Sequence, residues 1–265
     1  MGLVQVLCGG AGAVRIGSPT VAGARVVVVA VHDGAVASVA RRLAAAWPAG
    51  AAPAVLHTAG ARSAAELRPL ARLARGTGVF HPVVALLGAA SAERLGGAIA
   101  TISGDRSGLA AARALARALG MRPLRVEDRR RPVVHAAAVL AAGDLVALLG
   151  EAERLLVHAG VRRRTARVVL SALAGSAVAG YSARGVSALT GPVARADAAT
   201  LGRHVKALGP GDRSVAAIHA ALVRSGARQL CRAGVIDRAT ARRIDDAVSS
   251  GPSLPGVRRA RNLPS

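Results

Sequence analysis

Aromatic side chains are almost missing from this chain of 265 residues, which holds one Phe, one Trp and one Tyr. Ala, Val, Leu and Gly must therefore fill the core, as suits helices that pack closely on a sheet. The same scarcity bears on nucleic acids, because proteins that bind single strands usually stack the bases on aromatic rings. The formal net charge is +22, but the arginines are spread along the whole chain. We therefore expect no specific nucleic-acid partner.

Cysteine is also scarce. Cys8 and Cys231 stand far apart and in no motif, so a disulfide framework and a bound metal are both unexpected. No run of eighteen apolar residues is free of charge, and Asp144 interrupts the long apolar run 133–149. We expect that run to form a buried core helix, and the chain to have no membrane span. A cytoplasmic protein with free thiols is the interpretation that follows.

The first half of the chain alternates strand patterns with helix patterns. The run 25–31 is continuously apolar and rich in valine, which is typical of a strand buried on both faces of a parallel sheet. Asp33 is expected to cap the helix that follows, and Ser63 with Glu66 forms a capping box for another. Strands are predicted at 25–31, 54–58, 78–80, 99–103 and 123–126, and helices at 35–47, 63–74 and 107–119. Such alternation predicts a parallel α/β sheet.

The second half shows helical periodicity only. Helices are predicted at 133–159, 164–178, 197–208, 214–233 and 237–248, with a loop at 181–192. Gly160 and Gly234 stand where glycine commonly ends a helix, and Asp197 stands where it can cap one. We therefore predict a sheet domain over 1–128, a helical domain over 129–249 and a disordered tail over 250–265.

Histidines follow three of the predicted strands. His32, His57 and His81 each stand at or just after a strand end. The carboxyl ends of parallel strands lie at one edge of a sheet, where such folds bind ligands. A functional cleft and three ordinary loop histidines remain equally open interpretations.

Several stretches together resemble a known family. They are VVVVAVHDGAVASVARRL (26–43), VLHTAGARSAAELRPL (55–70), GVFHPV (78–83), VHAAAVLAAGDLVALL (134–149) and LTGPVARADAATLGRHV (189–205). They resemble an uncharacterised bacterial two-domain family named as NADP oxidoreductases, related to 6-phosphogluconate and 3-hydroxyacid dehydrogenases. The resemblance implies a Rossmann-like α/β domain followed by an all-α domain, an NADP or NAD cofactor, and a homodimer formed through the helical domain.

The resemblance also implies a site at the strand ends, between the two domains. The residues expected to contact the cofactor are Val31, His32, Asp33, His57, Thr58, Gly60 and His81. His135 becomes the candidate proton donor, with a plain helix-start residue as the alternative interpretation. Arg131 stands where the family commonly has Lys and can hold an anion, since it stays charged. A small anionic substrate is therefore expected at a catalytic pair formed by Arg131 and His135, in a basic cleft that is not suited to a metal.

The chain also departs from the family. Gly10, Ala11 and Gly12 offer G-x-G, but Arg15 occupies the position of the third glycine in G-x-G-x-x-G. We expect 3–7 to match the second strand of the family and 13–16 the third, so that the first strand, its phosphate-binding turn and the first helix are missing. Ala59, Ala142 and Gly143 replace polar family residues.

These departures leave three hypotheses. The chain is an oxidoreductase with impaired cofactor binding, or a non-catalytic dimeric binding or scaffold relative. In the third hypothesis Met1 is a misplaced start and the phosphate-binding turn lies upstream of it.

Overall fold

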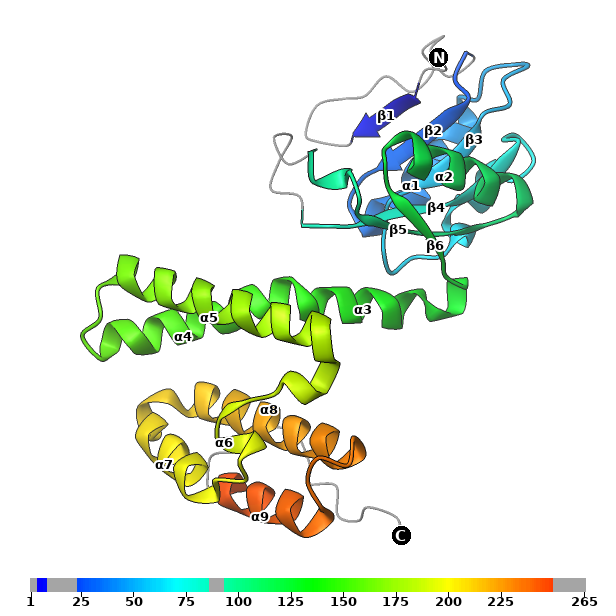
Figure 1. Ribbon diagram of the computed structural model, residues 1–265. Coiled ribbons are helices and arrows are strands. Elements are labelled where there is room, and N and C mark those ends of the chain that lie inside the picture. The colour runs from blue at the N-terminus through cyan, green and yellow to red at the C-terminus, as the bar shows by residue number, and fades with distance from the viewer. Residues whose placement is uncertain (1–3, 9–22, 86–92, 250–265) are drawn as a thin grey trace. The chain divides into compact units, whose positions relative to one another are not determined.

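The computed structural model describes residues 4–8, 23–85 and 93–249. The chain divides into two compact units, Met1–Val146 and Ala147–Ser265 (Figure 1). The change from strands to helices comes after residue 125, close to the boundary expected from the sequence. The first helix after the sheet nevertheless groups with the first unit. The expected tail 250–265 lies outside the described residues.

A six-stranded sheet forms the centre of the first unit, with its strands in sequence order. The strands are β1 (Val4–Cys8), β2 (Val26–Ala30), β3 (Ala54–His57), β4 (Gly76–Val83), β5 (Ile99–Gly104) and β6 (Arg122–Arg125). β1 to β4 pair in parallel, and so do β5 and β6. The predicted α/β sheet is confirmed for these pairs.

The pairing of β4 with β5 departs from the prediction, because the two strands are antiparallel. His81 on β4 lies opposite Thr101 on β5. Parallel neighbours need a crossover, usually a helix, whereas a short return suffices for an antiparallel pair. The described part of the connection 84–98 contains no α-helix, which is consistent with such a return.

β1 lies beside β2, with Val4 opposite Val26 and Cys8 opposite Ala30. In the common Rossmann strand order 3-2-1-4-5-6, the first strand lies beside the fourth. The alignment that makes 3–7 and 13–16 the second and third strands makes the run of β2 the fourth, and in this strand order the neighbour of the fourth strand is the first. The alignment that made 3–7 the second strand does not fit this pairing. The glycine-rich segment 9–12 and the run 13–16 lie outside the described residues.

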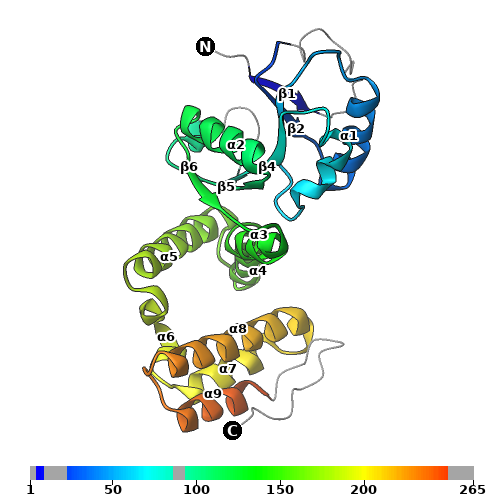
Figure 2. The ribbon, with the colours of Figure 1, turned by 90° about the vertical axis from the view of Figure 1, so that its right-hand side faces the viewer.

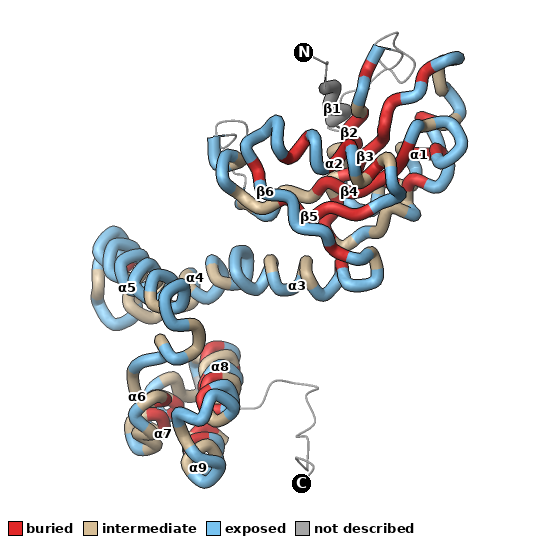
Figure 3. Tube along the Cα trace, turned by 45° about the vertical axis from the view of Figure 1, so that its right-hand side comes forward, coloured by how far each residue is buried: buried red, intermediate tan, exposed pale blue. Residues whose placement is uncertain are grey.

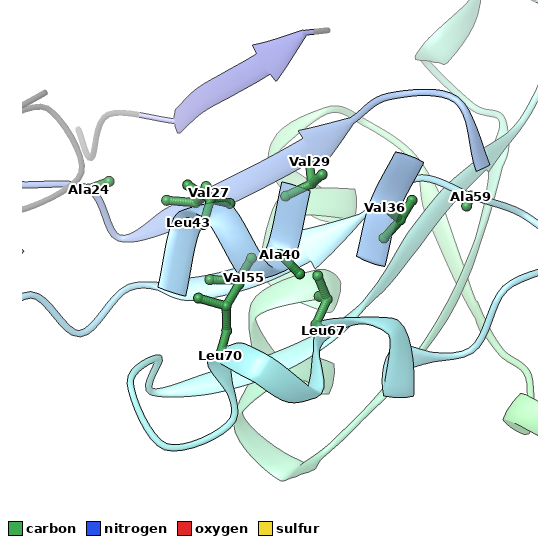
Figure 4. Packing of buried hydrophobic residues seen from close by; sticks show 10 residues of the cluster. All are labelled: Ala24, Val27, Val29, Val36, Ala40, Leu43, Val55, Ala59, Leu67 and Leu70. Carbon is green, nitrogen blue, oxygen red and sulfur yellow. The ribbon is translucent and has the colours of Figure 1, made fainter. Parts of the chain in front are cut away.

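Helices cover both faces of the sheet, as Figure 2 shows for α1 and α2. α1 (Val36–Ala45) and the 3₁₀ helix η2 (Ala64–Leu70) lie on the face that carries Val27 and Val29 of β2 (Figure 4). α2 (Arg106–Ala118) lies on the opposite face, where Val28 of β2 packs. This alternation along β2 explains the continuous valine run, since both of its faces are buried.

Asp197 and Ser63 accept backbone N–H bonds at helix starts, but the predicted capping box does not form, because the carboxylate of Glu66 binds Arg62 instead of the Ser63 N–H. The side chain of Ser63 accepts from the backbone N–H of Ala65, although η2 is a 3₁₀ helix that contains Pro69. Asp197 accepts from the N–H of Thr200 at 3.0 Å, as predicted. The predicted Asp33 cap is wrong: Asp33 lies inside the short 3₁₀ helix η1 (Asp33–Ala35) and caps neither η1 nor α1. The N-cap position of α1 is Ala35, two residues after Asp33, and alanine has no side-chain acceptor.

The helical part begins with η4 (Asp128–Arg130), α3 (Arg131–Ala141) and α4 (Gly143–His158). The single helix predicted at 133–159 is interrupted at Ala142, whose backbone leaves the helical region at φ −124° and ψ −78°. α5 (Arg163–Arg184) and the 3₁₀ helix η5 (Gly185–Ala188) occupy most of the segment predicted as a loop. Gly160 and Gly234, with φ of +89° and +71°, follow helix ends as predicted.

The last helices form their own core in the second unit. They are α6 (Gly191–Ala194), α7 (Ala198–Leu208), the 3₁₀ helix η6 (Pro210–Asp212), α8 (Arg213–Arg232) and α9 (Arg238–Ser249). Leu201 of α7, Leu230 of α8 and Ile244 of α9 are fully buried together. The expected helical C-terminal part is therefore present.

The expectation of a buried core helix at 133–149 is wrong. Figure 3 shows α3, α4 and α5 as mostly exposed, and Arg131 and Ala166 are the only buried residues of the three. The segments Asp128–His158 and Arg163–Ala194 are long and apolar enough to cross a membrane, with windows of mean hydropathy 2.0 and 1.2 that are 0% and 6% buried. The sequence pattern predicted apolar helical residues here correctly, but α3 and α4 are mostly exposed.

Candidate functional site

The site centres on a buried cation, Arg131, at the first residue of α3. Its side chain is only 1% exposed. The guanidinium donates from Nη1 to Oγ of Ser103 at 3.2 Å and from Nη2 to Oγ1 of Thr101 at 3.3 Å, and both hydroxyls lie on β5. Nε has no hydrogen-bond partner among the described residues. Arg131 thus carries a positive charge into the protein with only neutral partners.

No carboxylate in the described ranges forms an ion pair with Arg131. Asp128 acts on it from farther away, and its own Oδ2 accepts from the N–H of Ala64 at 3.0 Å, while Oδ1 is buried without a partner. Burial lowers the pKa of Arg131, and Asp128 raises it in part, but a guanidinium stays charged in proteins. A buried charge without a counterion is costly, so the site is suited to receive an anion.

His81 lies next to this cation. Its Nδ1 is 3.3 Å from Oγ1 of Thr101, the same hydroxyl that accepts from Arg131. Burial, then the charge of Arg131, then His135 lower the pKa of His81 from 6.5 to about 4, against an opposing effect of Asp33. His81 is therefore neutral at neutral pH.

His135, one turn along α3 from Arg131, faces His81. Their ring centroids are 5.5 Å apart, with the planes at 73°. Gly60 fills the corner between them: a Cβ at that position would lie 2.7 Å from Nε2 of His81 and closer than 3.0 Å to Nδ1 of His135. Only glycine leaves room for both rings, so the site depends on Gly60.

Besides burial, the charge of Arg131 also lowers the pKa of His57, but both ring nitrogens of His57 are hydrogen-bonded to the backbone. It is fully buried, its Nε2 is 3.0 Å from the carbonyl of Ser63, and its Nδ1 accepts from the N–H of Ala59. Burial lowers the pKa of His57, and the bond to Ser63 only partly opposes this. With both ring nitrogens bonded, His57 holds the loop that carries Gly60 in place.

The structure brings five of the nine predicted site residues together. They are His57, Gly60, His81, Arg131 and His135, all in the unit Met1–Val146. Asp33 is exposed and influences His81 only through its charge. His32 is exposed, while Val31 and Thr58 are half-buried; none of the three has a described contact with the five. The three strand-end histidines therefore do not form one group, because His32 stays apart.

Sequence reasoning missed Thr101, Ser103 and Asp128. Thr101 and Ser103 alternate with the buried Ala100 and Ile102 along β5, so both hydroxyls point to one face of the sheet. Two polar residues at this spacing in an otherwise apolar strand were the available signal. Asp128 had no comparable signal, since it stands in a charged run.

The arrangement offers a fixed positive charge, a neutral imidazole and a second, half-buried imidazole. Together they can bind an anionic group and exchange one proton with it. Within the described ranges, no group of three His, Cys, Asp or Glu side chains is placed to hold a metal ion.

Comparisons with known proteins identify the fold. The family described as Domain of unknown function (DUF2520) matches residues 98–225. A protein from Thermotoga maritima is 21% identical over 78% of both chains, with a TM-score of 0.64. A Bacteroides fragilis protein described as a "putative NADP oxidoreductase" is 22% identical over 76% of this chain and 74% of its own, with a TM-score of 0.62.

A more distant match is pyrroline carboxylate reductase from Plasmodium falciparum with NADP bound, which is 10% identical over 92% of this chain and 87% of its own, with a TM-score of 0.51. No curated protein matches the sequence. These similarities show that the chain has a Rossmann-like fold followed by a helical part.

We predict that the depressed pKa of His81 makes the protein less stable in mild acid. The folded-state pKa of about 4 lies below the ordinary value of 6.5, so between these values the unfolded chain binds a proton that the folded chain does not. The contribution of His81 is complete above about pH 6.5 and declines as the pH falls toward about 4. Urea unfolding over this range should show it.

The test variant is His81→Gln. Its matched control is His158→Gln, which replaces an exposed histidine of α4. His81→Gln should flatten the loss of stability without abolishing it, because burial also lowers the pKa of His57 and of His219. His158→Gln should leave the profile unchanged. An identical acid profile in the wild type and His81→Gln would show that His81 is not held neutral.

Proposed function

We propose that the protein is an NAD(P)-linked oxidoreductase acting on a small anionic substrate at the Arg131–His81–His135 site. The observation that carries the proposal is the buried, incompletely paired Arg131 beside two imidazoles, in a Rossmann-like sheet. In this fold class, ligands bind at the carboxyl edge of the parallel strands. β2 and β3 end there, and the residues that follow them include the predicted cofactor contacts.

The strand ends fit a nicotinamide dinucleotide. His32 and Asp33 after β2 are exposed, and Thr58 after β3 is half-buried with its N–H bonded to the carbonyl of Val29. Gly60, on the loop after β3, leaves room for the rings of His81 and His135 beside these strand ends. In the sequence, Gly9, Gly10 and Gly12 directly follow β1, where this class of fold places its phosphate-binding glycines.

The protein's own groups supply charge and a proton. A bound nicotinamide would accept or donate a hydride. Arg131 would attract the anionic group of the substrate, and His135 would exchange a proton with the substrate oxygen. His81, held neutral, can donate a hydrogen bond without adding charge.

A second candidate function is a non-catalytic binding or scaffold role. It is favoured by the hydrogen bonds of Arg131, whose guanidinium is occupied by Ser103 and Thr101 where the resembled family commonly has a Lys. The helix break at Ala142 and Gly143, where that family has polar residues, favours it too. Both functions retain an anion site, and they differ in whether a dinucleotide binds.

We predict that the protein binds NADPH or NADH weakly, with a dissociation constant above the micromolar range. Arg15 replaces the third glycine of G-x-G-x-x-G, the residue that allows close packing of helix and strand in this motif. Arg15→Gly should therefore tighten binding. Isothermal titration calorimetry of both proteins with each cofactor measures this, and Arg41→Gly on α1 is the matched control for the removal of one charge.

Micromolar or tighter binding by the wild type would contradict the impairment. Absence of binding by both the wild type and Arg15→Gly would contradict the oxidoreductase function and leave the binding role. A gain in Arg41→Gly equal to that in Arg15→Gly would attribute the effect to net charge rather than to the turn.

We also propose that a second copy of this chain covers the apolar helices, giving a homodimer. The exposed apolar side chains of α3, α4 and α5 are Val133, Val139, Leu140, Val146, Leu148, Val168, Val169, Leu173, Val178 and Tyr181. α4 and α5 also carry ion pairs, with Glu153 bound to Arg163 and Arg167 and Arg154 bound to Asp212. Charged pairs on the same helices favour an aqueous protein interface over lipid.

We predict that light scattering will report about twice the chain mass of 26.4 kDa, because unpaired apolar surface of this extent is normally buried in an interface. Leu173→Glu on α5 should dissociate the dimer by burying a charge. Leu124→Glu on β6, which replaces a similarly exposed leucine outside these helices, should not. A monomeric wild type, or protein that stays in solution only with detergent, would contradict the proposal.

A further inference from the structure

The hydrogen bonds around Thr101 determine where its single hydroxyl proton can go. Arg131 has only donors, so Oγ1 of Thr101 must accept from Nη2 of Arg131 at 3.3 Å. The hydroxyl proton can then go to the backbone carbonyl of His81 at 3.5 Å or, when the ring nitrogen carries no proton, to Nδ1 of His81 at 3.3 Å. The nearer acceptor is the ring.

We infer that Arg131 and Thr101 act as positioning residues that hold His81 in the tautomer with its proton on Nε2. The chain of donors runs from the guanidinium to the Thr101 hydroxyl and from that hydroxyl to Nδ1 of His81. A neutral imidazole that accepts at Nδ1 carries its remaining proton on Nε2. The buried cation thereby sets which end of the ring is a donor.

Electrostatics favours this tautomer over the other one. If Nδ1 carried the proton, its N–H and the guanidinium N–H would use both lone pairs of the Thr101 oxygen, the hydroxyl would donate to the carbonyl of His81, and two positive dipole ends would converge on one oxygen. When Nδ1 carries no proton, its lone pair faces Thr101 and the positive charge of Arg131, which is electrostatically favourable. Thr101 and Arg131 are 2% and 1% exposed, so water screens this difference poorly.

The opposite end of His81 lies near a ring nitrogen that has no partner in the part of the chain that the structure describes. Nε2 of His81 and Nδ1 of His135 both lie closer than 3.0 Å to the Cβ position of Gly60. Nδ1 of His135 is buried and has no hydrogen-bond partner among the described residues. An Nε2–H on His81 places a donor in the corner where this unpaired ring nitrogen needs one.

The consequence concerns His135. When its Nδ1 serves as the acceptor, its own proton resides on Nε2, so a neutral His135 presents an N–H to a ligand. A donor to a ligand oxygen is what the proposed proton exchange requires, and this last step rests on the proposed function. The tautomer of His81 does not, since it follows from the buried contacts alone.

The other titratable and charged groups around His81 do not favour the opposite tautomer, with the proton on Nδ1. Arg131 and His135 act from α3, His57 from β3 and Asp33 from η1. His57 has both ring nitrogens engaged with the Ser63 and Ala59 backbone. Asp33 acts on His81 through its charge, with no hydrogen bond to the ring.

The test is nitrogen NMR of the full chain with ¹⁵N-labelled histidine, at a pH above 6.5 where His81 is neutral. Long-range ¹H–¹⁵N correlations distinguish the two tautomers of each ring, and His81→Gln assigns the signal of His81. We expect a single Nε2–H pattern for His81 in the wild type. Thr101→Val removes the hydroxyl and should produce a mixture of tautomers, whereas Thr101→Ser keeps the hydroxyl and should keep the single pattern.

Ser103→Ala is the matched control, because it removes the other hydroxyl bound to Arg131 without touching His81; the pattern should survive it. An Nδ1–H pattern or a mixed pattern in the wild type would overturn the inference even if no variant folds. So would an unchanged single pattern in folded Thr101→Val. Failure here would leave the cofactor titration to decide the proposed function independently.

Discussion

The buried charge of Arg131 is the constraint on which the rest of the site depends. A guanidinium removed from water must be compensated by hydrogen bonds or by a counterion. Two hydroxyls of β5 provide part of this, and the unpaired Nε shows that compensation is incomplete. The same charge helps to hold His57 and His81 neutral by lowering the pKa of each. One side chain thus joins α3 to the sheet and adds to the effect of burial, which lowers the pKa of both imidazoles most.

The fold makes this placement possible. β4 and β5 run antiparallel with His81 opposite Thr101, so the imidazole and the hydroxyl meet across one pair of strands. α3 begins at Arg131 and brings His135 one turn later. Gly60, on the loop that His57 anchors, leaves the space into which both rings fit. A crossover that made β5 parallel to β4 would have given a different partner across the strands.

Particular residues show how far sequence could lead. The valine run of β2 predicted a strand buried on both faces, and the structure confirms it because such burial leaves a local signature. His32, His57 and His81 look equivalent in the sequence. In the structure His32 is exposed, and both ring nitrogens of His57 are hydrogen-bonded to the backbone. His81 lies beside Thr101 and is affected by the charge of Arg131. These differences depend on long-range contacts. The apolar helix at 133–149 was also predicted, but its composition does not say whether the same chain covers it.

Beyond the effect of burial, the charge of Arg131 lowers the pKa of His81. This effect is tested most directly by following the ring signals of His81 with pH in the wild type and in Arg131→Met, which keeps a long unbranched side chain and removes the charge. We expect a midpoint near the pKa of about 4 in the wild type and a clearly higher one in Arg131→Met. The midpoint should stay below 6.5, because burial, the largest cause, remains. Equal midpoints in the two folded proteins would show that the charge of Arg131 does not act on His81, and an ordinary midpoint in the wild type would show that the pKa of His81 is not lowered.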